Sequence, residues 1–114
     1  MAFNKETWVR GESLAAAFLK EQGFKILEVN FKNKTGEIDI ITKDGNTFVF
    51  VEVKARSSLK FGRPSEAVTK TKQNKIRRVA EGYLIKQKNY PAAARFDVIE
   101  ILDGKVEGHI KNAF

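Results

Sequence analysis

The sequence contains no cysteine and a single histidine, which excludes several kinds of site at the outset. Without cysteine the chain has neither a disulfide framework nor a thiolate metal site, as fits a reducing compartment. It also lacks a glycine-rich phosphate-binding loop, so nucleotide hydrolysis by that route is unsupported. No internal repeat or linker divides the chain, and 114 residues with 42% hydrophobic content suffice for one core. We therefore expect a single domain, residues 1–114.

Long apolar runs are missing as well. The first twenty residues, MAFNKETWVRGESLAAAFLK, interrupt their short apolar stretch with Lys, Glu and Arg, so they read as neither a signal peptide nor a spanning helix. The basic residues are not confined to one amphipathic helix, which argues against a membrane surface as the partner. We expect a soluble cytoplasmic protein.

What the sequence does have is positive charge. The net charge is +7 and the isoelectric point is near 9.7. This balance favours a polyanionic partner over a small neutral substrate, and nucleic acid is the first candidate.

Hydrophobic periodicity and turn residues divide the chain into two helices and four or five strands. The first helix, residues 5–22, places Ala15 and Leu19 on its apolar stripe and stops at Gly23. A three-stranded meander and a loop follow, and Ser65 is the expected N-cap of the second helix. The remaining elements are strands at 24–31, 37–42, 47–54 and 95–101, a helix from Glu66 to about Lys88, and a short strand near the C-terminus. This order predicts a small α/β or α+β sandwich around a mixed sheet.

Two charged residues end an apolar strand where charge is costly. Glu52 and Lys54 follow the run FVFV and project from the same face, roughly 6–7 Å apart along the strand. If Gly45–Asn46 forms a two-residue loop, or residues 44–47 a four-residue loop, paired positions of the hairpin place Asp39 opposite Glu52, with Cβ atoms ~4.5–5.5 Å apart. A register slip of one residue would destroy this arrangement.

Further carboxylates are expected at the same place. Glu37 shares a strand face with Asp39, and Glu12 lies on the stripe of the first helix that should pack on the sheet. Converging carboxylates raise each other's pKa unless a cation lies among them, and Lys54 compensates for only one. Because these ligands are hard oxygens, Mg²⁺ or Mn²⁺ is the expected cation. A metal between Asp39 and Glu52 would activate water and polarise a phosphoryl oxygen, with Lys54 holding the water or offsetting charge.

A simpler interpretation of the same residues remains open. Surface hairpins carry Glu and Lys at strand ends as edge protection, or as an ion pair worth ~0–1 kcal/mol. Taken singly, Asp39 and Glu37 also read as solvated strand residues, and Glu12 as a boundary residue of its helix. The spacing of an aspartate thirteen residues before E-x-K is what favours a site.

These motifs resemble those of a known superfamily. GEIDII followed by FVFVEVKAR is similar to the PD-(D/E)-x-K, or restriction-endonuclease-like, nucleases, although Ile38 stands where the superfamily name has proline. The resemblance is closer to the YraN-like family of small bacterial proteins, which look like archaeal Holliday junction resolvases, and it extends to GESLAAAFL, FGRPSEAVTKTKQNKI, RFDVIEI and the terminal NAF. It implies an αβββαβ fold and metal-dependent phosphodiester cleavage. In these motifs Asp39, Glu52 and Lys54 match the catalytic positions, and Glu12 matches the first-helix acid of resolvases.

Residues around the expected site complete the hypothesis. Gln73 extends the buried stripe of the second helix and either orients Lys54 or a water, or bonds to the backbone. His109 is interpreted as structural. The expected nucleic-acid contacts are Arg56, Lys60 and Arg63 on the loop and Lys72, Lys75 and Arg78 on the second helix.

The sequence therefore predicts a Mg²⁺- or Mn²⁺-dependent endonuclease that hydrolyses phosphodiester bonds in DNA, with branched or junction DNA suggested by the resolvase resemblance. The proposed catalytic residues are Asp39, Glu52, Lys54, Glu12 and Gln73, of which Asp39, Glu52 and Glu12 are the metal ligands. Two other classes compete: a non-catalytic nucleic-acid-binding module on the same fold, and a metal-binding adaptor protein. The resolvase resemblance also suggests a symmetric homodimer, because cutting a two-fold junction needs two sites.

Overall fold

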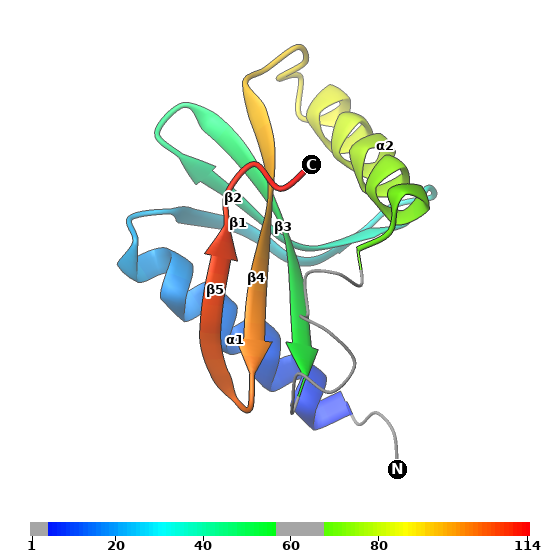
Figure 1. Ribbon diagram of the computed structural model, residues 1–114. Helices are drawn as coiled ribbons and strands as arrows, with labels where there is room; N and C mark the ends of the chain where they lie inside the picture. The colour runs from blue at the N-terminus through cyan, green and yellow to red at the C-terminus, as the bar shows by residue number, and fades with distance from the viewer. Residues whose placement is uncertain (1–4, 57–67) are drawn as a thin grey trace.

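A five-stranded sheet lies at the centre of the molecule, with one helix packed on each face (Figure 1). The computed structural model describes residues 5–56 and 68–114, with side chains from residue 11 onward. The helices are α1 (Lys5–Glu21) and α2 (Lys70–Lys86), and the strands are β1 (Lys25–Lys32), β2 (Glu37–Asp44), β3 (Thr47–Arg56), β4 (Ala94–Leu102) and β5 (Lys105–Ile110). The chain thus has the αβββαβ order, followed by a fifth strand, and the predicted α/β fold with a helix-flanked mixed sheet is confirmed.

Helix α1 buries the stripe that its periodicity predicts and ends where glycine allows it to end. Ala15 and Leu19 are fully buried against the sheet. Gly23 has a φ of +92°, a conformation that side chains disfavour, and the N–H of Phe24 donates to the carbonyl oxygen of Leu19 over 3.0 Å. The chain therefore turns directly from α1 into β1.

Helix α2 begins later than the sequence predicts. Its first residue is Lys70, and the Thr69 hydroxyl caps it by accepting the N–H of Lys72 over 3.3 Å. The expected start at Glu66 is wrong, and its expected cap, Ser65, lies outside the described residues. Serine and threonine are both good N-caps, so the residue types alone do not choose between them. Among the described residues no helix is long and apolar enough to cross a membrane.

The strands lie in the order β1-β2-β3-β4-β5. The first three form the predicted antiparallel meander, β3 and β4 run parallel with α2 as their connection, and β5 pairs antiparallel with β4. Strand β3 lies in the middle of the sheet and is covered on both faces. This position explains why its run FVFV is continuously apolar instead of alternating.

The β2–β3 hairpin has the predicted register. Asp44 pairs with Thr47 across the two-residue loop Gly45–Asn46, and the pairing continues to Ile40 opposite Val51. The next positions along the hairpin are Asp39 and Glu52. There the ladder ends, and the N–H of Val53 donates to Oδ2 of Asp39 over 2.8 Å. The two strands therefore separate at the predicted site, with a carboxylate at the point of separation.

Two hydrophobic clusters hold the helices to opposite faces of the sheet. On the α2 face, Phe50 packs edge-on against Tyr83, with ring centroids 6.1 Å apart. On the α1 face, Leu19, Val51 and Ile99 are all fully buried. Full burial of each such side chain contributes roughly 1.5–3 kcal/mol, so both helices are fixed firmly relative to β3.

A buried carboxylate fastens the C-terminal segment to the sheet. Asp97 on β4 is fully buried and accepts hydrogen bonds from Nε of Arg95 (3.0 Å) and the N–H of Asn112 (3.0 Å), and its Oδ2 lies 2.7 Å from Nε2 of His109. Burial alone would raise the pKa of Asp97, but His109 and Arg95 outweigh it and hold that pKa below its ordinary value. His109 therefore has a structural partner, as its sequence context suggested.

Candidate active site

The centre of the site is a pair of carboxylates on adjacent strands. Glu52 on β3 is only 6% exposed, and Asp39 on β2 is half-buried beside it. Burial, and then interaction with the Glu52 carboxylate, raises the pKa of Asp39 to about 9, although the hydrogen bond from Val53 favours its charged form. At neutral pH Asp39 therefore holds a proton and does not add a second negative charge beside Glu52.

A third carboxylate comes from α1. Glu12 is 3% exposed, and neither of its oxygens has a hydrogen-bond partner of normal geometry among the described residues. Burial, followed by the charges of Glu37 and Glu52, raises the pKa of Glu12 to about 7, and the nearby Asn30 side chain offsets only part of this. A buried carboxylate without a partner costs stability, so the burial of Glu12 lowers the stability of the folded state.

Two lysines adjoin the carboxylate pair. Lys54 lies two residues after Glu52 on β3, and burial, then the neighbouring Lys72, lowers the pKa of Lys54. Lys72 reaches across from α2 and places its Nζ 3.3 Å from Oε2 of Glu52. Burial would lower the pKa of Lys72, but its interactions with Lys54 and Glu52 outweigh burial and raise it. The two ammonium groups are thus unequal, and Lys54 is the one that gives up its proton more easily.

This arrangement of residues lies within a recognisable family. The sequence model of the uncharacterised protein family UPF0102 matches residues 11–101. The chain belongs to this family. A UPF0102 protein of Caldicellulosiruptor saccharolyticus is 54% identical over 109 residues (91% of this chain, 92% of the relative), and one of Thermodesulfovibrio yellowstonii is 53% identical over 105 residues (91% of each). A third, from Geobacter metallireducens, is 49% identical over 114 residues, covering 97% of this chain and 93% of the relative.

The UPF0102 match spans all of the site. Glu12 is the second residue of the matched region, and Asp39, Glu52, Lys54 and Lys72 all lie inside it. The resemblance to the YraN-like family is therefore confirmed at the level of family membership. The whole site belongs to the part of the chain that the family shares.

Two residues of the predicted site lie at its margin. The side chain of Glu37 is 59% exposed and forms a long ion pair, 3.8 Å, with Lys32, so it contributes charge near Glu12 without joining the carboxylate pair. Gln73 donates from Nε2 to the carbonyl oxygen of Val68 over 3.1 Å. This is the backbone-bonded alternative for Gln73, and it stabilises the approach to α2.

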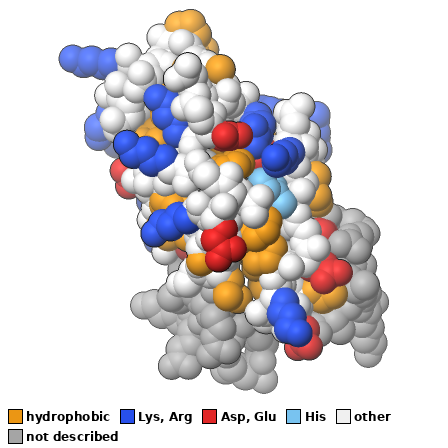
Figure 2. Space-filling view, turned by 90° about the vertical axis from the view of Figure 1, so that its left-hand side faces the viewer, with side chains coloured by type: hydrophobic (Ala, Val, Ile, Leu, Met, Phe, Trp, Pro, Cys, Tyr) orange, Lys and Arg blue, Asp and Glu red, His pale blue; other side chains and the backbone are white. Residues whose placement is uncertain are grey.

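The predicted nucleic-acid contacts are divided between several places. Lys60 and Arg63 lie outside the described residues, Arg78 is exposed on α2, and Arg56 is half-buried at the end of β3. Lys72 and Lys75 line a groove beside the site. On the face shown in Figure 2, Lys and Arg side chains are interspersed with Asp and Glu, so basic residues there do not form a single patch.

Sequence reasoning missed two features of the site. The sequence predicts only a nucleic-acid contact for Lys72, and its ion pair with Glu52 depends on where α2 packs, which no local pattern reveals. Asn30 was not assigned at all, although its side chain acts on Glu12. Its φ of +56° within β1 is a conformation that asparagine tolerates better than most residues, so an asparagine inside a strand was the available signal.

The donor atoms of the site suit a hard divalent cation. Within residues 5–56 and 68–114, no three Asp, Glu, His or Cys side chains are grouped closely enough to hold a metal as they stand. However, the raised pKa of Asp39 leaves it with a proton at neutral pH that a cation can replace, and the buried oxygens of Glu12 lack hydrogen-bond partners among the described residues. Carboxylate oxygens are the ligands that Mg²⁺ and Mn²⁺ prefer, so the residues present fit such an ion.

Proposed function

We propose that this protein is a metal-dependent nuclease of the PD-(D/E)-x-K superfamily that hydrolyses phosphodiester bonds in DNA. Three features support the proposal: the αβββαβ order, the hairpin register that brings Asp39 to Glu52, and Lys54 two residues further along β3. The observation that carries it is the carboxylate pair itself. Asp39 and Glu52 are held together at the end of a strand ladder, at a cost to stability that a cation would remove.

Asp39 and Glu52 would hold Mg²⁺ or Mn²⁺, and Glu12 would supply a further oxygen. Bound there, such an ion would lower the pKa of a water molecule and stabilise negative charge on a phosphoryl oxygen. Asp39 is held in place for this task by the N–H of Val53, and Glu52 by the Nζ of Lys72. Both ligands are therefore oriented by neighbouring groups before any ion arrives.

Lys54 is the residue with the chemistry of a base or a charge stabiliser. Its lowered pKa makes the neutral amine more accessible near neutral pH than that of an exposed lysine. In its charged form it would balance the negative charge that develops on the phosphate. The adjacent Lys72 keeps a positive charge at Glu52 in either case.

The experiment compares three variants with the parent on single-stranded, duplex, flap and four-way-junction DNA in the presence of Mn²⁺. Asp39→Asn preserves size and the acceptor for Val53 but is a poor cation ligand, so cleavage should fall by at least about 100-fold. Lys54→Ala should also abolish cleavage while Mn²⁺ binding, measured by calorimetry, is retained. Glu107→Gln, which makes the same carboxylate-to-amide change at an exposed position of β5, is the control and should cut as the parent does.

The outcomes separate the two leading functions. If the parent binds these DNAs but cuts none of them, the protein is a nucleic-acid-binding module. If Asp39→Asn cuts as well as the parent, the assignment of the carboxylate pair is wrong.

A further inference from the structure

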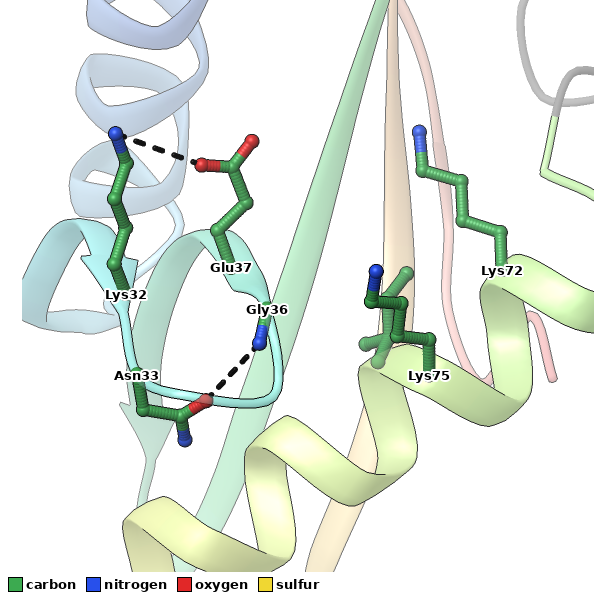
Figure 3. A pocket seen from close by; sticks show the side chains of 7 residues that line it. Lys32, Asn33, Gly36, Glu37, Lys72 and Lys75 are labelled. Atoms are coloured by element: carbon green, nitrogen blue, oxygen red, sulfur yellow. Dashed lines mark hydrogen bonds and ion pairs between the residues drawn. The ribbon is translucent and has the colours of Figure 1, made fainter.

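A groove runs between the β1–β2 turn and α2 (Figure 3), and one of its lining residues, Lys72, forms an ion pair with Glu52 of the carboxylate pair. The turn and α2 form its two walls. They contribute Lys32, Asn33, Gly36 and Glu37 on one side, and Lys72 and Lys75 on the other. Figure 3 shows the ammonium groups of the three lysines pointing toward the same side of the groove. Nothing in the sequence motifs assigned a role to Lys32 or to this turn.

The turn wall is held rigidly against α2. Oδ1 of Asn33 accepts the N–H groups of Thr35 (2.9 Å) and Gly36 (3.2 Å), which sets the shape of the turn, and its Nδ2 donates to the carbonyl oxygen of Val79 over 3.3 Å. At the inner end the turn approaches α2 closely: a Cβ on Gly36 would lie 3.1 Å from Cε of Lys75 and 3.3 Å from Cγ2 of Val79. The groove is therefore a formed feature of the fold.

The charge of the groove points to an anionic ligand. Three lysines line it against one carboxylate, Glu37, whose ion pair with Lys32 is long and exposed and so worth little. The first turn of α2 contains no acidic residue, and the positive end of the helix dipole adds to the same field. Flexible ammonium groups on both walls of the groove suit successive phosphates of a chain, which need charge at intervals and no fixed bidentate geometry.

One residue connects the groove to the carboxylates. Lys72 lines the groove, and its Nζ also lies 3.3 Å from Oε2 of Glu52. Glu37, at the other wall, acts electrostatically on Glu12. A chain of phosphates lying in the groove would therefore continue directly to Glu52 and Asp39.

We infer that this groove binds the sugar–phosphate backbone of the nucleic-acid strand that is to be cut, with Lys32 and Lys75 as phosphate contacts on opposite walls. The inference deepens the proposed nuclease function and rests on it for the identity of the ligand. Contacts of this kind position a strand without reading its bases, so binding in the groove should depend on salt and not on sequence.

The test measures binding of a fluorescent single-stranded oligonucleotide by anisotropy, in EDTA, over a series of salt concentrations. The double variant Lys32→Gln/Lys75→Gln removes two groove charges but keeps most of each aliphatic stem. The salt slope, log Kd against log salt concentration, should fall by about 1.4, because each phosphate contact on a single strand contributes ~0.7. Lys86→Gln/Lys105→Gln removes the same net charge at exposed positions outside the groove and should leave the slope unchanged.

A second variant should raise the affinity for the oligonucleotide instead of lowering it. Glu37→Gln removes the carboxylate that lines the groove, so it should tighten binding of the same oligonucleotide. An unchanged or weaker affinity would place the strand elsewhere. Equal slopes for the groove and control double variants, or no binding by the parent at low salt, would also overturn the inference.

Because binding in EDTA does not need cleavage, the two proposals fail separately. If oligonucleotide binding depends on the groove lysines but the parent never cuts DNA with Mn²⁺, the groove proposal stands and the nuclease proposal is rejected. If the parent cuts DNA but Lys32→Gln/Lys75→Gln has the same salt slope as the parent, the nuclease proposal stands and the groove proposal is rejected.

Discussion

Asp39→Asn should make the metal-free protein more stable, by an amount that grows with pH. The fold raises the pKa of Asp39 from its ordinary value of 3.8 to about 9, chiefly by burial and then by interaction with Glu52. Between these two values the folded protein holds a proton that the unfolded chain has released, so the free energy of unfolding decreases as pH rises. The stability associated with the protonated carboxyl is complete below the ordinary pKa and is lost as pH approaches 9.

The size of this stability change follows from the number of protons that the folded protein holds and the unfolded chain has released. One extra proton on the folded state lowers the free energy of unfolding by about 1.4 kcal/mol for each pH unit. Glu12 adds a second such proton up to its own pKa of about 7, so the parent curve should be roughly twice as steep at pH 5–6 as at pH 8. In Asp39→Asn the amide is neutral throughout and still accepts from Val53. Its advantage over the parent should therefore grow by up to about 4 kcal/mol between pH 5 and pH 8.

Urea denaturation in EDTA at constant ionic strength, repeated at each pH unit from 5 to 8, measures both curves. Glu107→Gln, which removes an exposed carboxylate on β5, is the matched control, and its curve of the free energy of unfolding against pH should be parallel to that of the parent. If Asp39→Asn also runs parallel to the parent, Asp39 does not hold a proton at neutral pH and the reasoning about the carboxylate pair is refuted.

Two further predictions concern the site and the sheet. Binding of Mn²⁺ at pH 7 should release about one to one and a half protons per ion, because the ion replaces the proton on Asp39 and part of the proton on Glu12, whose pKa is about 7; calorimetry in buffers of different ionisation enthalpy counts them, and a release near zero would contradict the proton on Asp39. Gly108→Ala should lower the free energy of unfolding by about 1–3 kcal/mol, because its Cβ would lie 2.9 Å from Oε1 of the buried Glu100. In Gly11→Ala the new Cβ meets, among the described residues, Cβ of Ala55 alone at 3.7 Å, so urea denaturation should show no loss of stability, and an equal loss in both variants would contradict the packing argument.

The hairpin was the most predictable part of the molecule. A two-residue loop at Gly45–Asn46 leaves one register, and side chains alternate with a period of two, so the position of Asp39 relative to Glu52 followed from counting residues. The burial of Glu12 was predictable for the same kind of reason, since helical spacing places it on the stripe with Ala15. Each of these features depends only on loop length, strand alternation or helical spacing, and these can be counted directly in the sequence.

The features that could not be predicted depend on packing between distant segments. The groove exists because the β1–β2 turn packs against α2, through a hydrogen bond from Asn33 to Val79 that joins residues 46 positions apart. The ion pair of Lys72 with Glu52 depends on the same packing, and on the helix starting at Lys70. A long side chain on a helix reaches many places, and only the position and rotation of α2 select one of them.

The chain buries carboxylates in two different ways, and the difference is the strongest physical argument for a ligand. Asp97 is fully buried and fully partnered by Arg95, His109 and Asn112, and its pKa lies below the ordinary value. Asp39 and Glu12 are also withdrawn from water, but their pKa values are raised to about 9 and about 7. Folding alone would favour the first solution at all three positions, since an uncompensated buried charge costs several kcal/mol. Among the described residues Asp97 forms ion pairs with Arg95 and His109, while neither Asp39 nor Glu12 forms one, and this contrast supports the proposed cation site.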